Sequence, residues 1–252
     1  MDTSTAKRSG KCVLCGGRPL SREHVWPRWI AALIKSQGGP VHIRSSGGAD
    51  YDTTQLDLTV RRVCRECNHG WMERMESEVR PFLTPMMTTT DSVTLSVEDQ
   101  FALARWYTKT MLMHDLTHST PRIPQDRYTE FFAEPRPFDD SVIWLGAYGG
   151  NRWPAFSDVT GTLVEYGTGE IAERHVAALT ALNVFLQSFL EAGAVWRAED
   201  SRRGLWRIWP ARDEPITFPR DGFAMTDEHV LAVTEQLRDR LRDRLQDRFS
   251  QP

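Results

Sequence analysis

Cys12-Val13-Leu14-Cys15 and Cys64-Arg65-Glu66-Cys67 contain all four cysteines of this 252-residue chain. Each stretch places two thiols three positions apart, and 48 residues separate the two pairs. Zinc in structural sites takes four ligands in a tetrahedron, and four thiolates complete that shell without leaving an open position. Cys12, Cys15, Cys64 and Cys67 are therefore predicted to hold one structural zinc ion, and any catalysis must use other residues.

Two vicinal redox pairs are the alternative reading of the cysteines. Thioredoxin-like chemistry needs a pair at a strand-to-helix junction in a βαβ unit, and the surrounding sequence has no such pattern. Residues 1–9 are expected to form a disordered polar leader, and they lack the apolar run of a secretory signal. We therefore expect a cytoplasmic protein, where thiols stay reduced and bind metal rather than form disulfides.

Composition places the chain among ordinary globular proteins, with 40% hydrophobic and 26% charged residues. No run of eighteen apolar residues occurs, so no membrane partner is expected. The net charge of −3 conceals an asymmetry between the two parts of the chain. Residues 1–82 carry 13 Lys and Arg against 9 Asp and Glu, whereas the remainder is acidic. Only the cysteine-bearing part has the sign of a phosphate-binding surface.

The cysteine module is expected to span residues 10–83. Its periodicity predicts a short helix at 29–34 and strands at 41–44 and 56–63. A helix is expected after Cys67 because Trp71, Met75, Val79 and Phe82 recur at helical spacing. Pro81 and Pro85 are expected to end that helix.

Residues 84–252 are expected to form a larger α+β domain whose role the sequence does not reveal. Ser96 and Asp99 predict the start of a helix at 97–114. Residues 121–137 contain four prolines and are expected to be a connector. Strands are predicted at 142–148, 161–166, within 176–185, and at 205–209.

A long amphipathic helix is expected at about 227–249. Its leucines recur every four residues and form one stripe, while Asp and Arg residues at the same spacing form like-charge columns. This pattern is typical of a solvated helix packed on its own domain. A homodimer contact is the alternative, although the stripe has no sustained heptad.

The run Glu23-His24-Val25-Trp26-Pro27 lies between the cysteine pairs, and Asn68 directly follows the second pair. This order resembles the HNH (His-Me finger) endonucleases that carry a zinc-holding treble clef. The resemblance covers about residues 10–83. It implies a ββα-metal module, a β-hairpin followed by a helix, that binds one Mg²⁺ or Mn²⁺ ion and hydrolyses phosphodiester bonds of DNA.

The resemblance also implies a role for each matching residue. His24 matches the general base that takes a proton from water. Glu23 and Asn68 match the ligands of the catalytic ion, with His69 as the fallback ligand; Asn68 could equally cap the following helix. DNA is the expected partner and RNA the alternative. Candidate phosphate contacts are the flanking arginines Arg22, Arg28, Arg61, Arg62 and Arg65.

One part of the family pattern is missing. The middle Asn, which holds the loop that carries the base, has no counterpart before the second cysteine pair, and Gln55, Asp57 or Thr59 would have to substitute. A catalytically inactive treble-clef module that binds nucleic acid or protein is therefore the alternative function.

Overall fold

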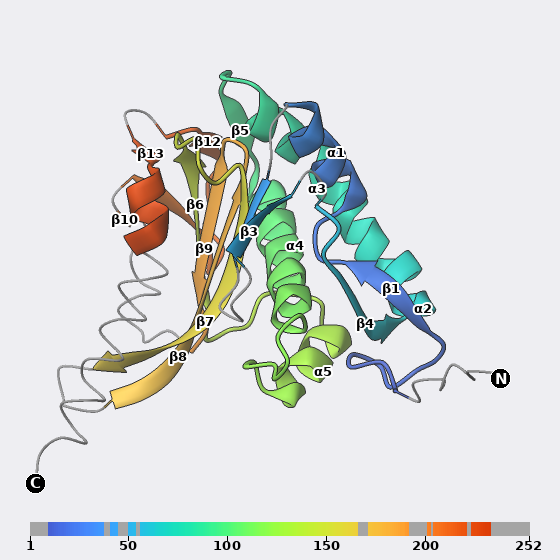
Figure 1. Cartoon of the computed structure of the whole chain (residues 1–252). Helices are drawn as coiled ribbons and strands as arrows, with labels where there is room; N and C mark the ends of the chain where they lie inside the picture. The colour runs from blue at the N-terminus through green and yellow to red at the C-terminus, as the bar shows by residue number, and fades with distance from the viewer. Residues whose placement is uncertain are drawn as a thin grey trace, which may run out of the picture.

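The computed structural model describes residues 10–37, 41–44, 50–53, 56–165, 171–191, 201–202, 204–220 and 223–232. The leader expected at 1–9 and most of the terminal helix expected at 227–249 lie outside these ranges. Within the described residues the chain forms three layers (Figure 1): a sheet, a central helix, and an outer layer of helices and a two-stranded ribbon. The fold is mixed α and β, as the sequence predicts.

The cysteine module is built on the antiparallel pair of β1 (Leu20–His24) and β4 (Thr59–Cys64). Helix α1 (Arg28–Ser36) follows β1, and β2 (Val41–Arg44) pairs with β3 (Asp50–Thr53). After β4 the chain turns through α2 (Arg65–Cys67) and the π-helical turn η1 (Asn68–Met72) into α3. The expected helix at 29–34 and strand at 41–44 are confirmed.

Helix α3 (Glu73–Thr88) continues through both prolines, so the prediction that Pro81 and Pro85 end it is wrong. Its buried face, which includes Val79 and Leu83, packs against α4. This packing outweighs the backbone hydrogen bonds that the two prolines cannot donate. Because α3 runs past residue 83, one apolar core continues from the cysteine module into the rest of the chain.

Helix α4 (Val97–Asp115) is the centre of the molecule. Its start is fixed by a capping box in which the Ser96 hydroxyl accepts from the Asp99 N–H and the Asp99 carboxylate accepts from the Ser96 N–H. One side of α4 contacts α3 and another contacts β7 and β11 of the sheet. Its second half is buried around the whole circumference, which explains why Lys109, His114 and Asp115 are inside the protein.

The sheet has seven strands in the order β10-β11-β6-β9-β8-β7, with β13 parallel to β6 and all other pairs antiparallel. Alternate residues of β6 show its two faces: Ile143 and Leu145 pack toward α4, whereas Val142 and Trp144 pack into a second core on the far face. The strands are β6 (Val142–Tyr148), β7 (Ala155–Glu165), β8 (Ile171–Ala181), β9 (Val184–Phe189), β10 (Ser201–Arg202), β11 (Leu205–Trp209) and β13 (Ala224–Met225).

The far face of the sheet is covered by the segment that follows β13. Residues 227–232 are helical, and Val230 is fully buried against the aromatic residues of that face. A separate small pair, β5 (Val93–Leu95) with β12 (Ile216–Phe218), joins the segment before α4 to the segment between β11 and β13. No helix in the described ranges combines the length and apolar character needed to cross a bilayer.

The stretch 121–137 contains helix α5 (Gln125–Ala133), so the expectation of a simple connector is wrong. Pro124 stands at the N-cap, where its lack of an N–H has no cost, and Tyr128 and Phe131 form the buried face. Buried Asp115 fixes this region: its carboxylate accepts hydrogen bonds from the N–H of Arg122 and Ile123 and from the Tyr128 hydroxyl at 2.6–3.1 Å.

Replacing Asp115 with Ala is expected to destabilise the protein by about 3 kcal/mol or more, because it leaves buried donors without an acceptor. Urea unfolding measures the change. The control is Asp91→Ala, at an exposed carboxylate, which should change stability by less than about 0.5 kcal/mol. Equal effects of the two substitutions would contradict this account of how α5 is held.

Candidate functional site

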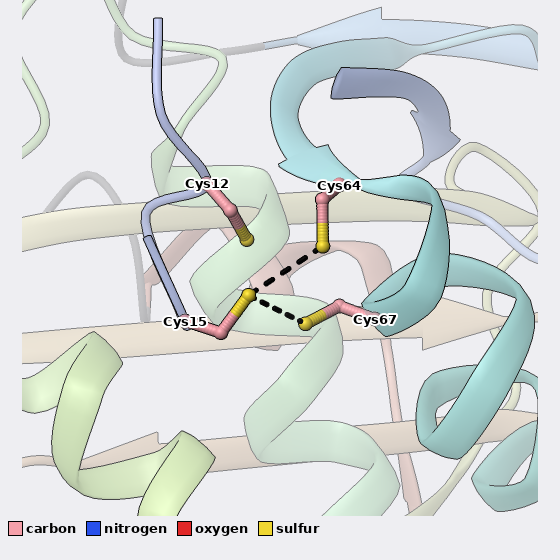
Figure 2. Close-up of side chains that lie close together, drawn as sticks. All are labelled: Cys12, Cys15, Cys64 and Cys67. Carbon is pink, nitrogen blue, oxygen red and sulfur yellow. Dashed lines mark hydrogen bonds between the residues drawn. The ribbon is translucent and has the colours of Figure 1, made fainter. Parts of the chain in front are cut away.

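The four cysteines come together at one end of the β1–β4 ribbon. Their sulfur atoms lie within 4.8 Å of one another, and Cys15 Sγ is 3.5 Å from both Cys64 Sγ and Cys67 Sγ. In Figure 2 all four side chains point toward a common centre, Cys12 and Cys15 from the N-terminal loop, Cys64 and Cys67 from the end of β4 and from α2. Within the described part of the chain, no other group of three or more His, Cys, Asp or Glu residues is arranged to hold a metal ion.

The first cysteine loop folds tightly because of its glycines. Gly16 has a φ of +74°, a conformation that other residues rarely adopt, and its N–H donates to the Cys12 carbonyl. Gly17 donates its N–H to Cys15 Sγ, and a Cβ on Gly17 would stand 3.1 Å from that sulfur. Burial raises the pKa of Cys12, but backbone N–H groups of Cys15, Cys64 and Leu14 outweigh this effect and lower it.

This arrangement fits a metal ion such as zinc. In a tetrahedral site with Zn–S bonds of about 2.3 Å, the sulfurs stand about 3.8 Å apart, close to the separations found here. Thiolates are also the ligands that select zinc over harder ions. A bound ion would cross-link the N-terminal loop to the ribbon, where the Val13 N–H already donates to the Arg62 carbonyl.

His24 stands at the other end of β1 and is partly open to solvent. Its Nε2 is 3.2 Å from Asp57 Oδ1, and its side chain is 20% exposed. Burial lowers the pKa of His24, the charge of Arg28 lowers it further, and Asp57 opposes both effects. The pKa of the imidazole is therefore held below its ordinary value, which favours the neutral form near pH 7.

Glu23, the neighbour of His24, is directed to the interior. Its carboxylate is 3.5 Å from the ammonium of Lys109 on α4, which also lies 2.8 Å from Glu76 on α3. Burial raises the pKa of Glu23 even though Lys109 opposes the effect. For Lys109, burial lowers the pKa, but the two carboxylates outweigh it and raise the pKa above its usual value. The Glu23 side chain thus lies in the protein interior, whereas that of His24 lies near the surface beside Asp57.

Asn68 is directed back toward β1. Its Nδ2 donates to Ser21 Oγ and to the Arg22 carbonyl, both at 3.0 Å. The amide therefore ties the start of η1 to the strand that carries His24. His69, next in the chain, is exposed.

All five predicted arginines are exposed: Arg22, Arg28, Arg61, Arg62 and Arg65. Two of them, Arg22 and Arg28, are close enough to His24 to lower its pKa by their charge. Arg61 and Arg62 lie on β4, and Arg65 begins α2 next to the cysteine cluster. The positive charges therefore follow the ribbon from the cysteines to His24.

A divalent ion held by Glu23 and Asn68 does not fit these residues. The Glu23 carboxylate already faces a buried ammonium, so an ion there would place two cations at one carboxylate. Asn68 donates to β1 through its Nδ2 and keeps its Oδ1, so the misfit lies at Glu23.

Sequence reasoning did not single out Lys109 and Glu76. The signal in the sequence is a lysine in a stretch that is apolar on both sides, with Trp106 and Tyr107 before it and Met111, Leu112 and Met113 after it, because a buried lysine requires a carboxylate partner. Which carboxylates pair with Lys109 depends on how α3 and β1 pack against α4, and this packing cannot be predicted from the sequence. Comparison of the chain with protein-family models, curated proteins and solved structures found no match.

We expect freshly purified protein to contain about one zinc ion per chain. Cys64→Ser should lower the zinc content well below one and the melting temperature by roughly 10 °C, because the cross-link between the first loop and the ribbon is lost. Elemental analysis and thermal unfolding measure the two effects. Full zinc content in the variant would show that the ion is bound elsewhere.

The pKa of His24 should lie below 6.5 and respond to its neighbours in opposite directions. Arg28→Gln removes a positive charge and should raise the pKa, whereas Asp57→Asn removes a negative charge and should lower it. NMR titration of the imidazole resonances measures both shifts. A wild-type value above 6.5, or shifts of the same sign in the two variants, would contradict the described geometry.

Proposed function

We propose that this protein hydrolyses phosphodiester bonds of nucleic acid, with DNA as the expected substrate and His24 as the general base. The observation that carries the proposal is the accessible His24 imidazole, which pairs with Asp57 and is flanked by Arg22 and Arg28. General base catalysis at neutral pH needs an uncharged imidazole with one free ring nitrogen and access to water.

Asp57 decides which nitrogen of His24 is free. A carboxylate next to Nε2 favours the tautomer that carries its proton there, which leaves the lone pair on Nδ1. In the proposed reaction Nδ1 removes a proton from water, and the water oxygen attacks phosphorus. The bond to the leaving oxygen breaks with its electron pair on that oxygen, which takes a proton from solvent, and the imidazolium later returns its proton to solvent. Asp57 stabilises the imidazolium that forms. This residue takes over the positioning role of the Asn that the family pattern contains.

The arginines provide the positive charge that the substrate requires. Arg22 and Arg28 flank His24 and are placed to meet the charge that develops on the phosphate during attack. Arg61, Arg62 and Arg65 are exposed on β4 and α2 of the same module and would suit neighbouring phosphates. The proposed role of the cysteine-bound metal is structural: it would cross-link the first loop to the end of the ribbon.

A non-catalytic module that binds nucleic acid is the second candidate. The observation in its favour is Glu23, which faces Lys109 in the interior and is not available to a metal ion. The two functions share the basic surface and differ in whether His24 acts on water. A cleavage assay therefore separates them.

Purified protein is expected to convert supercoiled plasmid to nicked and linear forms. Changing His24 to Ala should reduce the rate by about a hundred-fold or more, because general base catalysis contributes that much. The assay follows plasmid forms on a gel, and synthetic single-stranded DNA and RNA extend it to other substrates.

His229→Ala is the matched control, since His229 is an exposed histidine on the segment that covers the far face of the sheet. It should leave the rate unchanged. Cleavage that survives His24→Ala would remove His24 from the mechanism. Binding of DNA without cleavage of any substrate would favour the non-catalytic module.

A further inference from the structure

Lys109 is the one lysine among the buried residues of the described chain, and it has no exposed surface. Its ammonium lies 2.8 Å from Glu76 Oε1 and 3.5 Å from Glu23 Oε1. An ammonium removed from water is tolerated only when carboxylates or other acceptors surround it. The three residues come from three different elements, α4, β1 and α3, so the lysine joins the ribbon to the helical core.

A divalent ion bound by both Glu23 and Glu76 would have to take the position of this ammonium. Mg²⁺ and Mn²⁺ bind carboxylate oxygens directly, and in proteins they usually use one or two carboxylates together with waters. Here the two carboxylates, of buried Glu23 and of partly exposed Glu76, share Lys109, and the described residues provide no third His, Cys, Asp or Glu to complete a ligand group with them.

We propose that Lys109 is the built-in cation of this site: its ammonium holds Glu23 in the place of a divalent metal ion, so the reaction at His24 needs no added Mg²⁺ or Mn²⁺. The independence of the reaction from Mg²⁺ or Mn²⁺ rests on the proposed function, whereas the role of Lys109 toward Glu23 does not. Lys109 is a positioning residue in this scheme. It fixes β1 through Glu23, and β1 in turn presents His24 to the solvent.

Ion binding is tested on the zinc-loaded wild-type protein with Mn²⁺ alone, followed by electron paramagnetic resonance. Thiolates select zinc over Mn²⁺, so the cysteine cluster does not interfere. Wild type and Glu23→Gln should show the same weak background binding. A Mn²⁺ site in the wild type that Glu23→Gln removes would overturn the proposal.

The Lys109→Met variant tests the same point in the opposite direction. Without the ammonium, Glu23 and Glu76 lose the cation that they share, and a divalent ion that completes its shell with water should bind in its place. We expect Mn²⁺ to raise the melting temperature of Lys109→Met by several degrees and to have no such effect on Lys109→Met/Glu23→Gln. A Lys109→Met protein that folds and ignores Mn²⁺ would count against the proposal. If this variant does not fold, the wild type and Glu23→Gln still decide the question.

A cleavage assay is the third test of the proposal. Rates are compared in metal-depleted buffer with and without Mg²⁺, and Glu23→Gln is measured beside the wild type. Equal rates with and without Mg²⁺ support the built-in cation, and strict dependence on Mg²⁺ overturns it. Absence of cleavage under every condition refutes the proposed hydrolysis, while the Mn²⁺ measurements still report on Lys109.

Discussion

The packing of this protein depends on a lysine that cannot reach water. The interior of α4 contains an ammonium at residue 109, and the cost of removing that charge from solvent is repaid only if two carboxylates meet it. This requirement brings β1 and α3 close to α4, and the apolar contacts around the ion pair set how closely the three elements pack. The ribbon that carries His24 is therefore held against the core by a charge and by apolar contact together.

The cysteine cluster and the lysine hold opposite ends of the same strand pair. Cys64 ends β4 and lies beside Leu20, the first residue of β1, whereas Glu23 and His24 are at the last two positions of β1. A ribbon of two strands is marginal alone in water. The four-cysteine cluster holds one end of the ribbon and the buried ion pair of Lys109 holds the other. The ribbon thereby becomes a rigid support for the partly exposed His24 side chain. The Asn68 amide adds a third attachment between the two ends.

Local signals in the sequence predicted the parts of the fold that depend on local physics. The capping box at Ser96, the bounds of β6 and the clustering of the cysteines follow from residue type and spacing alone. Helix α5 and the passage of α3 through Pro81 and Pro85 did not, because buried tertiary contacts outweigh weak or contrary local preferences there. For the site, the sequence singled out Glu23 and His24 but not what each would face. Lys109 is 86 residues away from Glu23 in the chain, and only the packed structure brings the two together.

The alternation of a β-strand gives adjacent residues different tasks in this site. Glu23 and His24 are neighbours in sequence, yet one side chain enters the core and the other remains half-open beside Asp57. Lys109 lies between buried Glu23 and Glu76, whose side chain is 21% exposed, so one of the two carboxylates keeps contact with water. The ion pair anchors the inward residue of the strand, and its outward neighbour His24 stays partly open to solvent.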